Sequence, residues 1–328
     1  MDKLSKTSIP SDSRELKTSL GSKVLNTLGI YIGVIILALV GLVLDPLFLS
    51  PSHLLEIFAA EAQFLAIAIA GAYLITYGGK MADLSIPAIM TTAGFVTISC
   101  LEPFGFFPAL LAGMLSGCFI GLINGLCIGF LKVNPIIWTL AMNFIVDGVL
   151  RWFFEGKQIY PQNDLFLAIN QKNVPFYFLI FLITFFHLLT KSTKFGQSVL
   201  MVGASEKVSL ATGVKNGKVI TLMFVLSALC SAIAGICYCS SAKLATFNTG
   251  VGYDFKVVTA IVLGGVSLQG GKGYLSAAIG GLIFITFLET VMVLLGIQIY
   301  EQEIIKGVMF IAVVGFGVHL AKKAGRHV

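Results

Sequence analysis

Long apolar segments alternate with short polar connections from residue 27 to residue 320. Several of the apolar segments reach the ~20 residues that an α-helix needs to cross the ~30 Å hydrocarbon core of a bilayer. The pattern therefore predicts an all-α, polytopic integral membrane protein with about ten transmembrane helices in one transmembrane domain over 27–320. The segments lie at residues 27–44, 61–77, 84–99, 108–131, 135–154, 175–190, 219–240, 255–267, 274–295 and 303–320.

One of these segments, 255–267, is shorter than the others. It is expected to be tilted, broken or re-entrant rather than a straight crossing helix. Such a segment is tolerated only where the backbone groups at its ends are buried in protein or face an aqueous cavity.

The polar connections differ in the sign of their charge. The connections at 100–107 and 296–303 carry only acidic residues, whereas basic residues gather in the arm 1–26, the central interval 191–218 and the tail 321–328, and at Lys80, Lys132 and Lys272. Cytoplasmic connections are enriched in Lys and Arg. Ten crossings with both termini in the cytoplasm satisfy every connection, so 1–26 is predicted as a cytoplasmic arm and 321–328 as a cytoplasmic tail.

The composition supports the same class of protein. Of the 328 residues, 57 % are hydrophobic and only 12 % are charged, against about 25 % charge in ordinary soluble domains. The net charge of +6 lies mainly in the arm, the central interval and the tail, so it reflects topology and predicts no nucleic-acid partner. The six cysteines are expected to be small buried side chains, and no disulfide, metal or other cofactor is predicted.

The central interval 191–218 is the only long hydrophilic interval between apolar segments, with five lysines and one acid, Glu206. Within it, Gly203 to Gly213 has the composition of a short helix with a glycine at each end, and Ser205 is placed to serve as its N-cap. A cytoplasmic helix presented to a partner protein is one interpretation. A solvated connector is the other.

The segment 108–131 carries a glycine at every fourth position. Five glycines on one helical face favour the close approach of a neighbouring helix backbone, as in small-xxx-small packing. Since each glycine costs a helix about 1 kcal/mol relative to alanine, the sequence predicts a helix-packing face. A pore-lining groove is the alternative. The residues are Gly113, Gly117, Gly121, Gly125 and Gly129.

The next segment carries polar residues at the same fourfold spacing. A mid-helix Asp costs about 2.5–3.5 kcal/mol on membrane-insertion scales, so it should face the bundle interior, a partner or water. Asp147 and Arg151 are also spaced to pair with each other. Interhelical hydrogen bonds with an internal salt bridge are one interpretation, and a solute pathway is the other. The pathway candidates are Thr139, Asn143 and Asp147, with Asn124 and Glu289 as weaker candidates.

No pattern of catalytic carboxylates, His/Cys metal ligands or nucleophile elbow is found in the sequence, so the chain is not expected to be an enzyme. The glycine-rich run 264–273 resembles a phosphate-binding loop, but that motif requires Gly-x4-Gly-Lys followed by Ser or Thr. Here Val266 replaces the first glycine and Gly273 replaces the hydroxyl residue. Any energy source must therefore be an ion gradient or another polypeptide.

The same run carries a family resemblance. Together with Gly250-Val251-Gly252-Tyr253, the stretch from Ala260 to Gly273 resembles the signature of bacterial ABC-transporter permeases for ribose, xylose, galactose and related solutes. Gly78-Gly79 with Asp83-Leu84-Ser85 is similar to that family's Gly-Gly-x-Asp-Leu-Ser, with two extra residues between. The stretch from Gly203 to Val214 is similar to its cytoplasmic coupling segment. The resemblance covers roughly residues 50 to 320.

The resemblance implies a multi-pass permease subunit of the bacterial inner (plasma) membrane that imports a sugar or sugar-like solute. It implies three kinds of protein partner: a cytoplasmic ATP-binding-cassette ATPase, a solute-binding protein, and a second permease subunit that is identical or paralogous. The residues that it assigns to ATPase coupling are Gly203, Ser205, Glu206, Leu210, Ala211 and Gly213.

Two other classes of function remain open at this point. An ion-gradient-driven secondary carrier would use Asp147 or Glu289 as its coupling carboxylate, and a membrane scaffold would turn the polar stripe towards a partner. Inverted repeats favour a carrier, but the echo between Gly78-Gly79-Lys80 and Gly270-Gly271-Lys272 is too short to count as a repeat.

Overall fold

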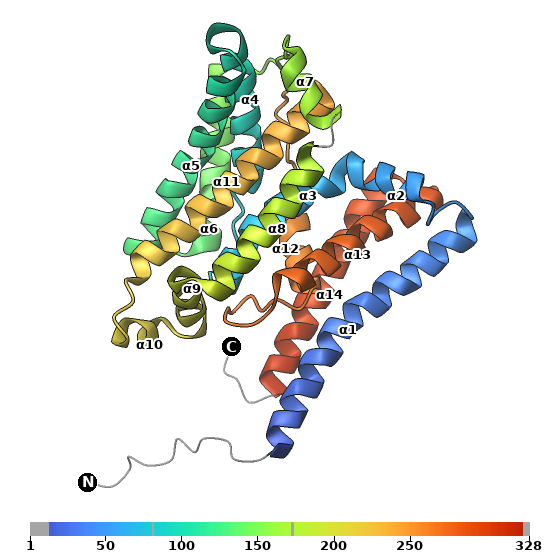
Figure 1. Cartoon of the computed structure of the whole chain (residues 1–328), viewed down its shortest axis with the longest axis vertical. Coiled ribbons are helices and arrows are strands. Elements are labelled where there is room, and N and C mark those ends of the chain that lie inside the picture. The colour runs from blue at the N-terminus through green and yellow to red at the C-terminus, as the bar shows by residue number, and fades with distance from the viewer. Residues whose placement is uncertain (1–12, 81, 172–173, 324–328) are drawn as a thin grey trace.

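The computed structural model describes residues 13–80, 82–171 and 174–323, and these residues form helices and loops with one isolated bridge between Ile159 and Ala245. Figure 1 shows a bundle of long, mostly aligned helices. In chain order the elements are α1 (Ser13–Leu44), α2 (Pro51–Ile57), the π-helical turn η1 (Phe58–Ala62), α3 (Gln63–Tyr77), α4 (Ile86–Phe104), α5 (Phe106–Phe130), α6 (Pro135–Phe153), α7 (Asp164–Gln171), α8 (Val174–Ser192), α9 (Lys194–Ala204), α10 (Glu206–Ala211), α11 (Asn216–Ala242), α12 (Tyr253–Leu263), α13 (Leu275–Leu294) and α14 (Ile299–Lys323).

Each apolar segment predicted from the sequence is mostly helical, so the all-α polytopic class is confirmed, although 255–267 extends four residues beyond the end of α12 at Leu263. Seven helices among the described residues are long and apolar enough to cross a bilayer, and Gly29–Leu44 forms a shorter apolar stretch. Helix α12 has 11 residues, or about 16 Å at 1.5 Å per residue, so it cannot cross a ~30 Å core by itself. The count of ten crossings stays a prediction.

The core is built around α3 and α11. Every residue of α3 from Gln63 to Thr76 is buried, which suits a helix that is apolar on all sides. Helix α11 packs against α3, α4 and α5, while α13 packs against α1 and α12. Helices α6 and α8 lie at the periphery, with most of their side chains exposed to the surroundings of the bundle.

The glycine face of α5 lies against α11. A Cβ atom on Gly117 would lie 2.6 Å from the Ala232 Cβ, and one on Gly125 would lie 2.6 Å from the Thr221 Cα. Added carbons on Gly121 and Gly129 would meet the backbone carbonyls of α11, and one on Gly113 would meet Thr97 of α4. Since no Cβ fits at these positions without a shift of the neighbouring helix, the backbones of α5 and α11 approach closely.

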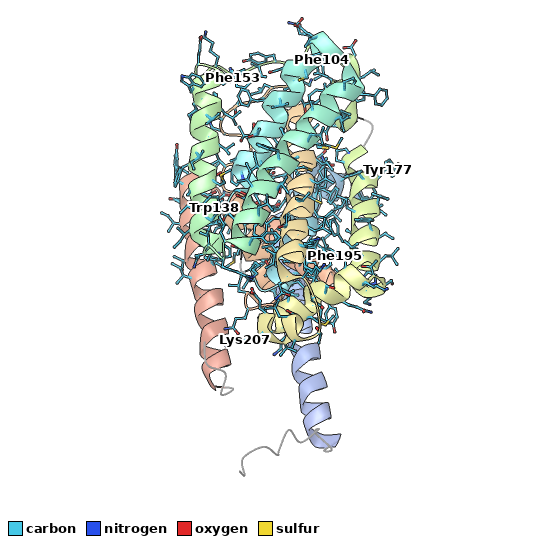
Figure 2. All side chains as sticks on the ribbon, turned by 90° about the vertical axis from the view of Figure 1, so that its left-hand side faces the viewer. Phe104, Trp138, Phe153, Tyr177, Phe195 and Lys207 are labelled. Carbon is cyan, nitrogen blue, oxygen red and sulfur yellow. The ribbon has the colours of Figure 1, made fainter. Side chains whose placement is uncertain are left out.

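The two ends of the bundle differ. Helices α9 and α10 lie at the same end as the start of α1 and the end of α14, and α2 and α7 lie at the other (Figure 1). Figure 2 likewise places Lys207 at one end and Phe104 and Phe153 at the opposite end. Residues 13–26 of the predicted polar arm belong to α1, and residues 321–323 of the predicted tail belong to α14; residues 1–12 and 324–328 lie outside the described part.

Candidate functional site

The central hydrophilic interval folds into two short helices, α9 and α10, rather than the one expected over 203–213. That expectation was wrong about Gly203, which lies inside α9 and does not start the second helix. Ser205 separates the two helices, and its hydroxyl oxygen accepts a hydrogen bond from the Val208 amide, as the N-cap prediction requires. Gly213 follows α10 with φ +84°, a conformation that glycine adopts without strain.

Glu206, the first residue of α10, lies between two lysines from different connections. Its carboxylate pairs with Lys80, which follows α3, and lies 3.1 Å from the Nζ of Lys132, which follows α5. Burial, and after it the nearby charge of Lys132, lower the pKa of the Lys80 amine to about 8. We call these three residues the Glu206 clasp.

A glycine cluster joins the end of α3 to two further segments through their backbones. The Gly271 amide donates a 2.8 Å hydrogen bond to the Tyr77 carbonyl at the end of α3. A Cβ on Gly270 would lie 2.5 Å from the Gly79 Cα, and one on Gly203 would lie 2.8 Å from the Gly271 nitrogen. The end of α3, the end of α9 and the loop after α12 therefore meet at one point, where only glycine allows such close approach.

Helix α10 is hydrogen-bonded to the start of α11 on one face and exposed on the other. Ser209 is buried and its hydroxyl lies 2.9 Å from the Asn216 Oδ1, while the Asn216 amide donates to the Glu206 carbonyl at 3.0 Å. In contrast, Val208 and Leu210 expose 61 % and 59 % of their surface. Two neighbouring exposed apolar residues on a helix that is held in place by hydrogen bonds suit contact with another protein.

The polar candidates of α5 and α6 are hydrogen-bonded to the start of α4. Thr139 accepts from the Leu84 amide at 3.0 Å, and Asn143 accepts from the Ala88 amide at 3.1 Å. Asn124 donates to the Ser85 hydroxyl at 2.8 Å and accepts from the Trp138 indole at 3.1 Å. Unpaired amides at a helix start are costly inside a membrane protein, and these side chains satisfy them.

Asp83 is a buried acid just before the start of α4. The Ser85 hydroxyl and amide both donate to its Oδ1, at 2.6 and 2.9 Å. Burial raises the pKa of the Asp83 carboxyl above its ordinary value, and the two hydrogen bonds act in the opposite direction.

Asp147 lies apart from the other polar candidates of its stripe. It pairs with Arg151 at 2.7 Å, one helical turn along α6, and both side chains are partly exposed. The Arg151 guanidinium also lies 4.7 Å from the centre of the Phe247 ring. The Asp147 charge is therefore neutralised within α6 rather than by the bundle interior.

Glu289 belongs to a cluster of charges between η1, α12, α13 and α14. The Lys256 Nζ lies 2.7 Å from the Glu61 Oε1 and 3.1 Å from the Glu289 Oε1. The Lys306 Nζ lies 3.0 Å from the same Glu289 oxygen and also pairs with Glu303. Lys256, Glu289 and Lys306 are largely buried. We call these five residues the charged cluster.

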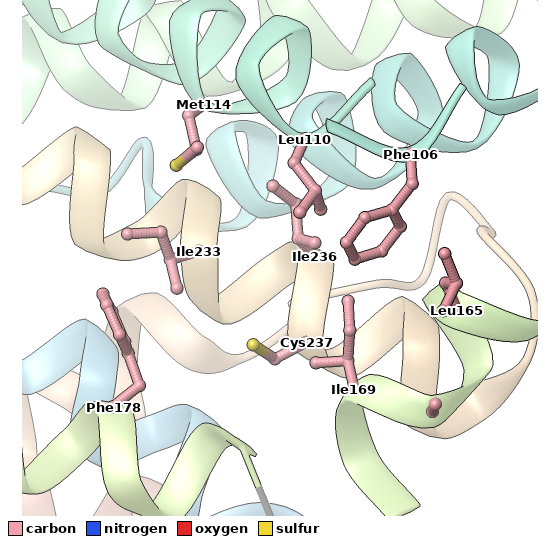
Figure 3. Close-up of a pocket in the computed structure, with 10 residues that line it drawn as sticks. Phe106, Leu110, Met114, Leu165, Ile169, Phe178, Ile233, Ile236 and Cys237 are labelled. Atoms are coloured by element: carbon pink, nitrogen blue, oxygen red, sulfur yellow. The ribbon is translucent and has the colours of Figure 1, made fainter. Parts of the chain in front are cut away.

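Two cavities differ in chemistry. The first, of about 410 Å³, lies between α5, α7, α8 and α11 (Figure 3), and its ten lining residues are apolar apart from the thiol of Cys237. The second, of about 440 Å³, lies between α12 and α14 and meets the charged cluster. Its lining includes Phe255, Lys256, Thr259, Glu303, Lys306 and Phe310. We call it the α12–α14 cavity.

Comparison with known proteins decides the family. A family model described as the permease component of branched-chain amino acid transport systems matches residues 54–314. The chain belongs to this permease family. It is 34 % identical over 242 residues to the L-arabinose transport system permease protein AraH of Escherichia coli (strain K12). This match covers 71 % of the chain and 73 % of AraH.

Two further relatives extend the match over most of this permease. The ribose import permease protein RbsC of Bacillus subtilis (strain 168) is 30 % identical over 306 residues, 89 % of this chain and 92 % of its own. The D-allose transport system permease protein AlsC of E. coli (strain K12) is 26 % identical over 302 residues, with 89 % and 91 % covered. No solved structure matches the chain significantly.

The permease family settles the class of function that the sequence left open. The chain is the transmembrane permease subunit of an ABC importer, a multi-pass protein of the inner membrane. The alternative of a gradient-driven carrier finds no support. Glu289, one of its proposed coupling carboxylates, is paired with two lysines.

Sequence analysis of this permease missed Glu61, Lys256 and Lys306. Each lies in or at the edge of a predicted apolar segment, where an ionisable residue is unusual and points to a functional or paired site. That signal was present in the sequence. The sequence could not show that η1, α12, α13 and α14 bring Lys256 within hydrogen-bonding distance of Glu61 and Glu289, and Lys306 within that distance of Glu289.

Proposed function

We propose that this permease imports a monosaccharide and is driven by a separate cytoplasmic ATPase that docks on α10. The solute class is supported by the relatives, whose names specify L-arabinose, ribose and D-allose. The observation that carries the docking proposal is the geometry of α10, which exposes Val208 and Leu210 while the Glu206 clasp holds its first residue to the ends of α3 and α5.

Each residue of the coupling segment has a part in this proposal. Leu210 contacts the ATPase, with Ala211 beside it on an exposed surface. Ser205 and Gly213 define the ends of α10. Glu206 and Gly203 connect the segment to the transmembrane bundle, by charge and by backbone contact respectively. A movement imposed on α10 would therefore reach α3 and the loop after α12.

The remaining partners follow from the same proposal. A solute-binding protein delivers the sugar at the end of the bundle opposite α10, and a second permease subunit, identical or paralogous, completes the membrane domain in the lipid bilayer. Asn124, Thr139 and Asn143 support the start of α4, and Asp147 pairs with Arg151. Glu289 is the pathway candidate that pairs with Lys306, a residue that lines the α12–α14 cavity.

The docking proposal is tested by Leu210→Arg in proteoliposomes that contain the permease, its ATPase and its binding protein. We expect sugar uptake to fall at least tenfold, because a charge at the centre of an apolar contact costs about 2–4 kcal/mol. ATP hydrolysis should no longer respond to the loaded binding protein. Uptake would be measured with radiolabelled L-arabinose, D-ribose and D-allose.

Leu188→Arg is the matched control, since Leu188 exposes 54 % of its surface near the end of α8 and lies outside α10. It should leave ATP hydrolysis responsive to the loaded binding protein. Normal uptake in the Leu210 variant would refute docking on α10. Failure of the unmodified complex to move any monosaccharide of a broad panel would refute the solute class.

A further inference from the structure

The charged cluster is difficult to explain as a stabilising device. Each of its five ionisable groups would cost about 2.5–3.5 kcal/mol at the centre of a bilayer. Well-packed apolar residues can replace buried ion pairs without loss of stability. The cluster has three carboxylates and two amines, so opposite charges do not balance one to one. We therefore expect the charged cluster to have a functional role in addition to helix packing.

The local backbone around the cluster is also irregular. Glu61 lies in η1, a π-helical turn within an otherwise α-helical stretch from Pro51 to Tyr77. Single π-helical turns inside α-helices occur frequently at functional sites. Lys256 lies in the first turn of α12, the short helix, which follows Gly252 with φ +82°. Helices interrupted inside a membrane protein are tolerated where they border a cavity.

The α12–α14 cavity has the size of a small-molecule site, with a mostly apolar wall that carries a few polar groups, as such sites commonly do. Its volume of about 440 Å³ lies within the ~300–1,000 Å³ range of small-molecule sites. Lys256, Lys306, Glu303 and the Thr259 hydroxyl offer hydrogen-bond donors and acceptors at its wall. The rings of Phe255 and Phe310 lie 6.1 Å apart, edge to face, and form an apolar wall.

We propose that the α12–α14 cavity is a site where the transported solute contacts the permease, and that it accepts a neutral, polyhydroxylated molecule of monosaccharide size. Hydroxyl groups would exchange hydrogen bonds with Glu303, Lys306 and Thr259, and the C–H face of the sugar ring would lie against Phe255 and Phe310. This inference rests on the proposed function. The apolar cavity of Figure 3 offers no such groups.

Glu303→Gln and Thr259→Val test the site. The first removes a charge but keeps the side-chain shape, and the second removes a hydroxyl without touching an ion pair. Uptake of D-ribose, L-arabinose and their monodeoxy analogues would be measured at saturating solute with the same ATPase and binding protein. Because every permease variant is assayed with the same binding protein, the preference of that protein for one sugar over another affects all variants equally.

We expect each variant to change the ratio of maximal uptake rates between a parent sugar and at least one deoxy analogue by about fivefold, the effect of one lost hydrogen bond. The half-saturation concentration should stay unchanged, because the binding protein sets it. A purely structural role would instead lower the uptake of all sugars by the same factor. Glu155→Gln is the control, because Glu155 pairs with Lys157 in an exposed position away from the cavity.

Unchanged ratios in both variants, with sugar uptake intact in the unmodified complex, would overturn the cavity assignment and leave the proposed function standing. If Glu303→Gln fails to insert, the Thr259→Val ratio alone decides. Absence of monosaccharide uptake in the unmodified complex would instead overturn the proposed function itself, since no permease substitution is involved.

Discussion

At the scale of single residues, the Glu206 clasp joins a short surface helix to the bundle. Glu206 and Lys132 lie 74 residues apart in sequence, and Lys80 comes from a third connection. Lys80 is the first of the three residues that separate Gly78-Gly79 from Asp83-Leu84-Ser85, where the family pattern has one. The turn that departs from the family pattern in length therefore contains the more buried of the two lysines that face Glu206.

A charge swap tests the clasp. Lys80→Glu and Glu206→Lys should each reduce the coupling of ATP hydrolysis to uptake, because each places like charges together. The double variant should recover most of that coupling. In a double-mutant cycle of thermal stability, the pair should show an interaction energy of about 0.5–3 kcal/mol. The same swap at the exposed Lys157 and Glu155 pair should give about 0.2–1 kcal/mol. Additive effects at the clasp would contradict a direct interaction.

At the scale of elements, two features of the chain decide how the helices pack. The glycine face of α5 allows α11 to approach until backbone atoms meet. Helix α3 is buried on all sides and runs about 22 Å, from η1 with Glu61 to the glycine cluster at Tyr77. It is therefore the element that lies between the charged cluster and the coupling segment.

A pair of glycine substitutions tests the packing of α5. Gly125→Ala should destabilise the permease by about 1–3 kcal/mol, because its Cβ would displace the backbone at Thr221. Gly148→Ala on α6 is the control, since no atom lies within 4 Å of the added carbon, and it should be neutral or stabilising by up to about 1 kcal/mol. Thermal unfolding in detergent measures both. Equal melting temperatures would argue against close backbone contact at Gly125.

At the scale of the whole molecule, the two ends of the bundle have different chemistry. One end carries α9, α10 and the Glu206 clasp, and the other carries exposed aromatic residues such as Phe104 and Phe153 (Figure 2). The distribution of lysines predicts by the positive-inside rule that the first end faces the cytoplasm.

Residue accessibility in whole cells tests this orientation. Lys207→Cys should react with a membrane-impermeant thiol reagent only after the inner membrane is permeabilised. Phe104→Cys should react while the inner membrane is intact, once the reagent can pass any outer layer of the cell envelope. The six native cysteines are buried or half-buried, and the unmodified chain measures their background. Labelling of the Lys207 variant from outside would reverse the assignment, and with it the proposed docking of an ATPase on α10.

Much of the fold could be predicted from the sequence, because it depends on local pattern. Apolar runs must form helices in a membrane, since each backbone polar group needs a partner within its own segment. The N-cap at Ser205 could be recognised too, because it depends on a side chain and an amide only three residues apart. The division of the coupling segment into two helices could not, because Gly203 lies within α9 at a point where Tyr77 and Gly271, distant in sequence, pack against it.

The sequence by itself determined that this is a helical membrane protein with no nucleotide-binding loop of its own, since hydrophobicity and motif spacing are properties of neighbouring residues. Only the tertiary structure decided which charges meet. Glu61, Lys256, Glu289 and Lys306 come from four elements spread over 245 residues, and their pairing depends on how the helices pack. Hydrophobic pattern specifies that a helix is buried but not which neighbour it faces, so the α12–α14 cavity became visible only in three dimensions.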